Sequence, residues 1–121
     1  VQLTRPADKE EVLDAFRASP RIALIRMADG LTAINAVKEM MADLGRPNDS
    51  LYEVALWEDM LRVEGDELFY AYMVDNQAIV IPETIDAIRA LTQAEPDGAA
   101  SIARTNAALG VGAFAANTPT R

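Results

Sequence analysis

The stretch LYEVALWEDMLRVEGDELFYAYMV, residues 51–74, decides the fold class of this chain. Over residues 52–57, Tyr52, Val54 and Leu56 alternate with Glu53, Ala55 and Trp57, which is the period of a β-strand. Residues 60–63 and 67–74 flank a turn at Gly65, so these two runs are expected to pair as a hairpin. The centre of the chain is therefore expected to form a β-sheet.

Helix and strand patterns alternate on the N-terminal side of this stretch. Asp8 stands three residues before Glu11, which is the spacing of a capping box at a helix start. Thr32 can cap a second helix, whose apolar residues recur at helical spacing from Ile34. We expect, in order, a strand over 1–5, a helix over 9–18, a strand over 21–27 and a helix over 34–44.

Two further helices are expected on the C-terminal side. Pro82 can occupy the first position of a helix that continues to Leu91. A last short helix over 101–109 is closed by Gly110, and residues 112–121 are expected to form a flexible tail. The order β-α-β-α-β-β-β-α-α predicts an α+β fold, with helices packed on a mixed or mostly antiparallel sheet.

The composition excludes several kinds of chemistry. The 121 residues include no Cys and no His, and 19 acidic against 11 basic side chains give a net charge of -8. This sequence therefore offers no thiol nucleophile, no Cys-His zinc site and no histidine general base. The acidic charge disfavours nucleic acid and anionic membranes as partners. No apolar run approaches the roughly 20 residues that a membrane span needs.

Arg46, in the polar loop 46–50, is a candidate ligand for a substrate phosphate, because a guanidinium can bind an anion through two hydrogen bonds. The alternative is an ordinary surface arginine. The acidic pairs at 10–11 and 58–59 fit a helix start and a strand end, so no catalytic residue and no metal ligand is assigned.

A second candidate site consists of Asn76 and Gln77, which follow a strand and precede the helix at Pro82. A carboxamide both donates and accepts hydrogen bonds, which suits recognition of another carboxamide such as nicotinamide. The alternative is an amide-rich turn that binds nothing.

The ordered segments of the chain together resemble the C-terminal part of archaeal-type (type II) glyceraldehyde-3-phosphate dehydrogenase. No single segment is a strong motif, but their order and spacing agree with the family from about residue 1 to residue 111. The segments are DKEEVLDAFRASPRIALI (8–25), LYEVALWED (51–59), IPETIDAIRAL (81–91) and SIARTNAALGV (101–111).

The resemblance implies a partial catalytic domain over 1–81 and C-terminal helices over 82–111. Members of the family are glycolytic, cytoplasmic homotetramers that convert glyceraldehyde 3-phosphate and phosphate to 1,3-bisphosphoglycerate with NAD or NADP. Their Cys nucleophile, catalytic His and Rossmann domain lie upstream of the part that this chain resembles. The resemblance therefore implies that the isolated chain is inactive.

The resemblance also implies one contact with the cofactor. Most members carry His-Gln-Glu-Ser before Val-Pro-Glu, and that Gln contacts the nicotinamide end of the cofactor. This sequence has Asp75, Asn76, Gln77 and Ala78 at these positions. Asn76 is the first candidate for the contact, because it keeps the amide with one methylene fewer, and Gln77 is the second.

The competing hypothesis is a free-standing, non-enzymatic α+β module that binds a ligand or associates with itself. A piece of a larger enzyme is expected to expose apolar side chains on its last two helices, over 85–91 and around Ile102 and Leu109. A complete small module is expected to show no such patch.

Overall fold

The computed structural model describes residues 1–112, and it confirms the expected α+β class. All of the tail expected over 112–121 except Gly112 lies outside the described residues. The helices are α1 (Lys9–Arg17), α2 (Ile34–Asp43), α3 (Val80–Leu91) and α4 (Gly98–Leu109). The strands are β1 (Ile22–Ile25), β2 (Val54–Trp57), β3 (Arg62–Glu64), β4 (Glu67–Phe69) and β5 (Tyr72–Met73).

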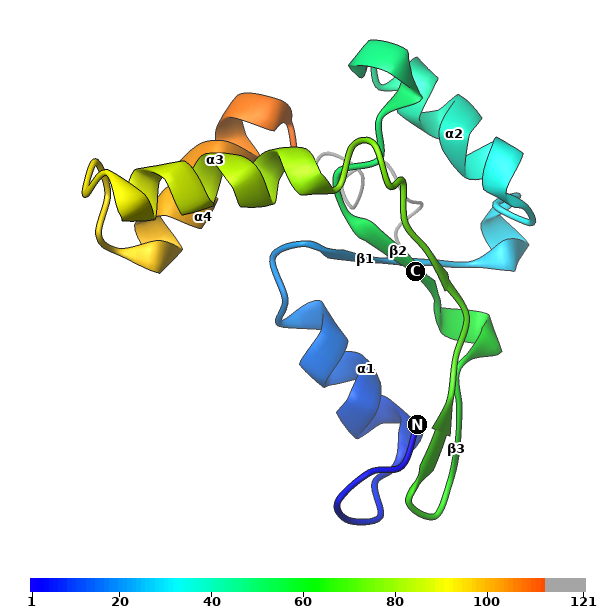
Figure 1. Cartoon of the computed structure of the whole chain (residues 1–121). Helices are drawn as coiled ribbons and strands as arrows, with labels where there is room; N and C mark the ends of the chain where they lie inside the picture. The colour runs from blue at the N-terminus through cyan, green and yellow to red at the C-terminus, as the bar shows by residue number, and fades with distance from the viewer. Residues whose placement is uncertain (113–121) are drawn as a thin grey trace.

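The central sheet is mixed, as expected, with β2 in the middle (Figure 1). β1 pairs with β2 in parallel, with Ile22 opposite Val54, and β5 pairs with β2 antiparallel, with Met73 opposite Ala55. The hairpin expected at Gly65 is confirmed by the pairing of β3 with β4, but it forms a separate two-stranded sheet. A parallel pair needs a crossover connection, and α2 supplies it between β1 and β2.

Successive side chains of a strand point to opposite faces, so the sheet has a core on each side. The core on the α2 side contains Ala23, Ile25, Leu31, Val37, Met41, Leu51, Ala55, Trp57 and Met73. The core on the α1 side contains Leu13, Leu56, Leu61 and Leu68. Figure 1 shows α1 and α2 on opposite sides of β1 and β2.

Two strand predictions need correction. The strand expected over 1–5 is reduced to one isolated bridge, between Gln2 and Glu67. The single strand expected over 67–74 is two strands. β4 pairs with β3 in the hairpin, whereas β5 pairs with β2 in the central sheet. Period-2 alternation shows which residues are extended, but it does not show a change of partner within an extended run.

Several predicted helix boundaries also differ. α3 begins two residues before Pro82, and α4 begins at Gly98, because the carboxylate of Asp97 accepts hydrogen bonds from the backbone N–H groups at its start. Ala33 rather than Thr32 is the N-cap of α2. The cap expected at α1 is confirmed, since the Glu11 N–H donates to Asp8 at 2.9 Å.

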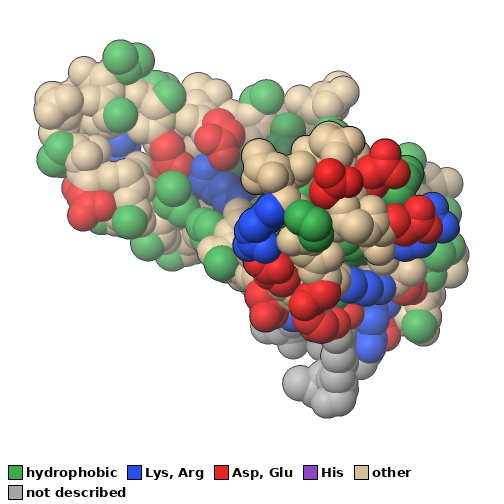
Figure 2. Space-filling view, turned by 90° about the horizontal axis from the view of Figure 1, so that it is seen from below, with side chains coloured by type: hydrophobic (Ala, Val, Ile, Leu, Met, Phe, Trp, Pro, Cys, Tyr) green, Lys and Arg blue, Asp and Glu red, His purple; other side chains and the backbone are tan. Residues whose placement is uncertain are grey.

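α3 and α4 pack against each other as a helical hairpin, here called the arm, which stands away from the body formed by residues 1–73 (Figures 1 and 2). The expected apolar exposure on the arm is seen in part. Ile88 is 54% and Leu91 84% exposed, whereas Ile102 and Leu109 are half-buried. The loop of residues 74–79 joins the body to the arm.

Candidate functional site

Asn76 and Gln77 lie next to each other in the turn between β5 and α3, and both are exposed. Within the described residues 1–112, neither carboxamide is hydrogen-bonded to another side chain or to the backbone. Each therefore keeps its N–H donors and its carbonyl acceptor for a ligand. Such a group can in principle hydrogen-bond to another carboxamide, such as that of nicotinamide.

Asp75 fixes the start of this loop. Its Oδ2 accepts a hydrogen bond from Lys38 Nζ at 2.7 Å, and it also lies 3.5 Å from the backbone N of Leu51. Its Oδ1 accepts from the N–H of Gln77 at 3.2 Å. One carboxylate thus joins α2, the segment before β2 and the loop that carries the two carboxamides.

These contacts keep Asp75 charged. Burial raises the pKa of its carboxyl, but the hydrogen bonds from Lys38, Leu51 and Gln77, together with the charge of Lys38, lower it more. The pKa of Asp75 therefore lies below its ordinary value, and the anchor is an ion pair near neutral pH.

Arg46 is not on the surface, because its side chain is only 4% exposed. Its guanidinium makes two hydrogen bonds of 2.6 Å to the carboxylate of Glu53, which is itself 3% exposed, and it lies 5.2 Å from the ring centre of Tyr52. It also donates to the carbonyl of Gly110 at 3.0 Å. A phosphate at Arg46 would have to displace Glu53, so the structure offers a structural role for this arginine.

A second group of charges connects the body to the arm. Arg21, just before β1, donates to Asp86 and Glu83 of α3 and to Asn106 of α4. Burial raises the pKa of Asp86, but hydrogen bonds from Ser101, Thr105 and Arg21 lower it more, so the pKa lies below its ordinary value. Hydrogen-bonded ions therefore link the arm to the body.

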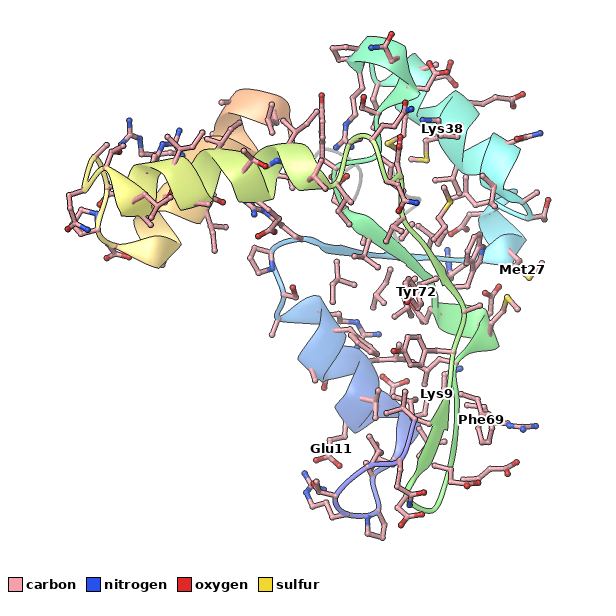
Figure 3. All side chains as sticks on the ribbon, in the orientation of Figure 1. Lys9, Glu11, Met27, Lys38, Phe69 and Tyr72 are labelled. Carbon is pink, nitrogen blue, oxygen red and sulfur yellow. The ribbon has the colours of Figure 1, made fainter. Side chains whose placement is uncertain are left out.

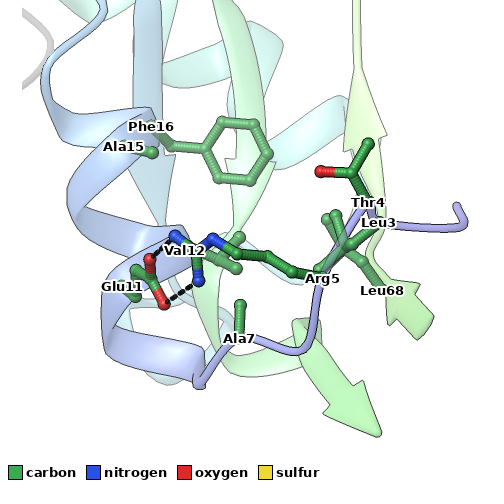
Figure 4. Close-up of a pocket in the computed structure, with 9 residues that line it drawn as sticks. All are labelled: Leu3, Thr4, Arg5, Ala7, Glu11, Val12, Ala15, Phe16 and Leu68. Carbon is green, nitrogen blue, oxygen red and sulfur yellow. Dashed lines mark hydrogen bonds and ion pairs between the residues drawn. The ribbon is translucent and has the colours of Figure 1, made fainter. Parts of the chain in front are cut away.

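One hollow in the described part of the chain has a volume of about 310 Å³ and lies between the N-terminal segment and α1. It is lined mainly by apolar side chains such as Leu3, Val12 and Phe16 (Figure 4). Its charged groups, Arg5 and Glu11, are paired with each other at its rim.

Among residues 1–112 no three acidic side chains gather where they could hold a metal ion. In that same range no helix is long and apolar enough to cross a membrane.

The sequence patterns did not predict three of these charged contacts. Lys38 and Arg21 find their partners 37 and 65 residues away, and nothing in the local pattern indicates them. Glu53 did carry a signal, because it shares a strand face with Ala55 and Trp57. An acid on an apolar face predicts a buried partner cation.

The described residues define an α+β domain with a helical arm, and no protein-family model matches the chain. Several curated proteins, mostly archaeal, do match, and they are named glyceraldehyde-3-phosphate dehydrogenase.

The chain is 36% identical to the protein of Methanobrevibacter smithii over 111 residues, which are 92% of this chain and 33% of the relative. It is 39% identical to that of Metallosphaera sedula over 112 residues, or 93% of this chain and 33% of the relative. The protein of Methanopyrus kandleri is 40% identical over 92% of this chain and 32% of its own length. These matches confirm the resemblance, and the chain spans about one third of the length of these relatives.

Proposed function

We propose that this chain acts as the C-terminal part of a phosphorylating glyceraldehyde-3-phosphate dehydrogenase. The full protein would oxidise glyceraldehyde 3-phosphate with NAD or NADP, take up phosphate and form 1,3-bisphosphoglycerate in glycolysis, as a cytoplasmic homotetramer. The observation that carries the proposal is the match over 92% of the chain to proteins of that name.

Within that enzyme the chain contributes binding rather than covalent chemistry. It contains no Cys and no His, so the nucleophile and the group that moves the proton would come from elsewhere in the full protein. When bound, the cofactor would supply the hydride acceptor. Asn76, with Gln77 as the second candidate, would hold the nicotinamide carboxamide and so orient the ring.

The body and the arm would support that contact. β5 and α3 flank the loop, and both ends of the arm are tied to the body, by Arg21 near its start and by Arg46 at Gly110. A side chain that recognises a ligand needs neighbours that hold it in place.

The first experiment is to sequence the gene upstream of Val1. The proposal expects about 200 further codons that encode a dinucleotide-binding strand-loop-helix and a Cys nucleophile. The protein made from the complete frame should oxidise glyceraldehyde 3-phosphate with NAD or NADP, whereas the 121-residue chain alone should not. A frame that opens directly before Val1, or activity of the isolated chain, would contradict the proposal.

A further inference from the structure

Lys38 belongs to α2, yet its ammonium group reaches the loop that carries the two candidate carboxamides. Its Nζ lies 2.7 Å from Asp75 Oδ2, and the side chains of the pair are only 31% and 15% exposed. Partial burial strengthens such a contact, because water screens it less. The pair therefore ties the loop to α2, whose Val37 and Met41 are buried in the core.

Asp75 transmits this anchor to the residues that follow. Its carboxylate accepts from the N–H of Gln77, and its backbone carbonyl accepts from Ala78 at 3.0 Å and from Ile79 at 2.8 Å. Ala78, the residue after Gln77, is only 2% exposed, so its burial also holds the loop in place. Asn76 is thus held between two fixed points while its own side chain stays unengaged.

We propose that Lys38 and Asp75 are positioning residues that hold the carboxamide of Asn76 ready for the nicotinamide of the cofactor. The proposal rests on the proposed function, and it adds an ion pair that does not itself touch the cofactor. An anchored loop loses less conformational entropy when the ligand binds, so its hydrogen bond contributes more to affinity.

The test uses the full-length dehydrogenase with Lys38→Met. This change removes the charge and keeps most of the side-chain volume. The KM for the cofactor should rise by about 3- to 10-fold, and the upper end corresponds to the loss of one hydrogen bond to the cofactor. The KM for glyceraldehyde 3-phosphate should stay within about twofold of the wild-type value. Lys38→Arg, which restores the cation, should recover most of the affinity.

Lys9→Met is the matched control, because Lys9 is the other lysine of this sequence and lies exposed on α1 (Figure 3). It should leave both KM values unchanged. Hydrogen exchange followed by mass spectrometry gives a readout apart from activity. Residues 75–79 should exchange faster in Lys38→Met than in wild type or Lys9→Met.

A double-mutant cycle shows whether the effect passes through Asn76. In an Asn76→Ala background, Lys38→Met should cause no further rise in the cofactor KM. If Lys38→Met raises the cofactor KM as much in the Asn76→Ala background as in wild type, the proposal is overturned. It is also overturned if Lys38→Met leaves the cofactor KM unchanged although the loop exchanges faster. In both cases an active wild-type protein would still support the proposed function. A wild-type protein that does not oxidise glyceraldehyde 3-phosphate would overturn both. Asp75→Asn, which removes the same ion pair from the other side, should repeat each result.

Discussion

The body and the arm are held in place by different forces. The body has apolar cores on both faces of its sheet, with Leu13 on one side and Met41 on the other, both fully buried. The arm is tied to the body through Arg21, with Asp86, and through Arg46. Apolar burial is strong but non-directional, whereas hydrogen-bonded ions fix one orientation. The body therefore supplies stability, and the charged contacts set where the arm and its preceding loop lie.

The largest expected effect tests the charged contact that is also buried. Arg46→Met leaves the carboxylate of Glu53 without its cation at 3% exposure, and it should lower the free energy of unfolding by about 3–5 kcal/mol. Urea denaturation of the chain measures it. The double variant Arg46→Met with Glu53→Leu should recover much of the loss, because no uncompensated charge remains. A single variant within about 1 kcal/mol of wild type would show that the pair is not desolvated.

The next prediction compares the two regions directly. Leu13→Ala removes a fully buried side chain from the body and should cost about 2–5 kcal/mol of unfolding free energy. Ile88→Ala removes a 54% exposed side chain from the arm and should stay within about 0.5 kcal/mol. The same denaturation experiment measures both. Equal losses would mean that Ile88 is buried against something in solution, for example a second copy of the chain.

Acid should loosen the charged contacts. Asp75 and Asp86 have a lower pKa in the folded chain than the ordinary 3.8, so the unfolded chain binds more protons than the folded one. The stability that they contribute is complete well above pH 4, and it is lost as the pH falls below about 4 through the folded pKa values. The measurement is the free energy of unfolding as a function of pH. Asp75→Asn with Asp86→Asn should flatten the curve in this window, and an unchanged slope would contradict the assignment.

The sequence predicted the body better than the contacts that bind the arm. The alternation over 52–57 and the helical stripe from Ile34 predicted sheet and helix, because both patterns depend on local burial. The pairs Lys38–Asp75 and Arg21–Asp86 depend on which distant segments meet, and a single sequence does not contain that information in any local pattern. The exposed loop carrying Asn76 was found because its residue types are unusual after a strand. Whether it binds a cofactor remains a prediction.

The smallest expected change in stability is that of Asn76→Ala. The side chain of Asn76 is exposed and makes no hydrogen bond to the rest of residues 1–112. Removing its carboxamide should therefore change the free energy of unfolding by less than about 0.5 kcal/mol. In the full-length protein it should weaken cofactor binding by about 2- to 10-fold, which corresponds to one hydrogen bond of about 0.5–1.5 kcal/mol. Titration of the cofactor by fluorescence measures this affinity.

Gln77→Ala is the matched variant, one residue further along the same exposed turn. If Asn76 makes the contact, Gln77→Ala should leave cofactor affinity unchanged, and the reverse result would assign the contact to Gln77. If cofactor affinity is unchanged in both variants, neither carboxamide contacts the cofactor, and residues 76–77 are an amide-rich turn that binds no ligand. Since neither change disturbs packing, any loss of affinity in this pair reports on recognition alone, which no variant of the buried body can do.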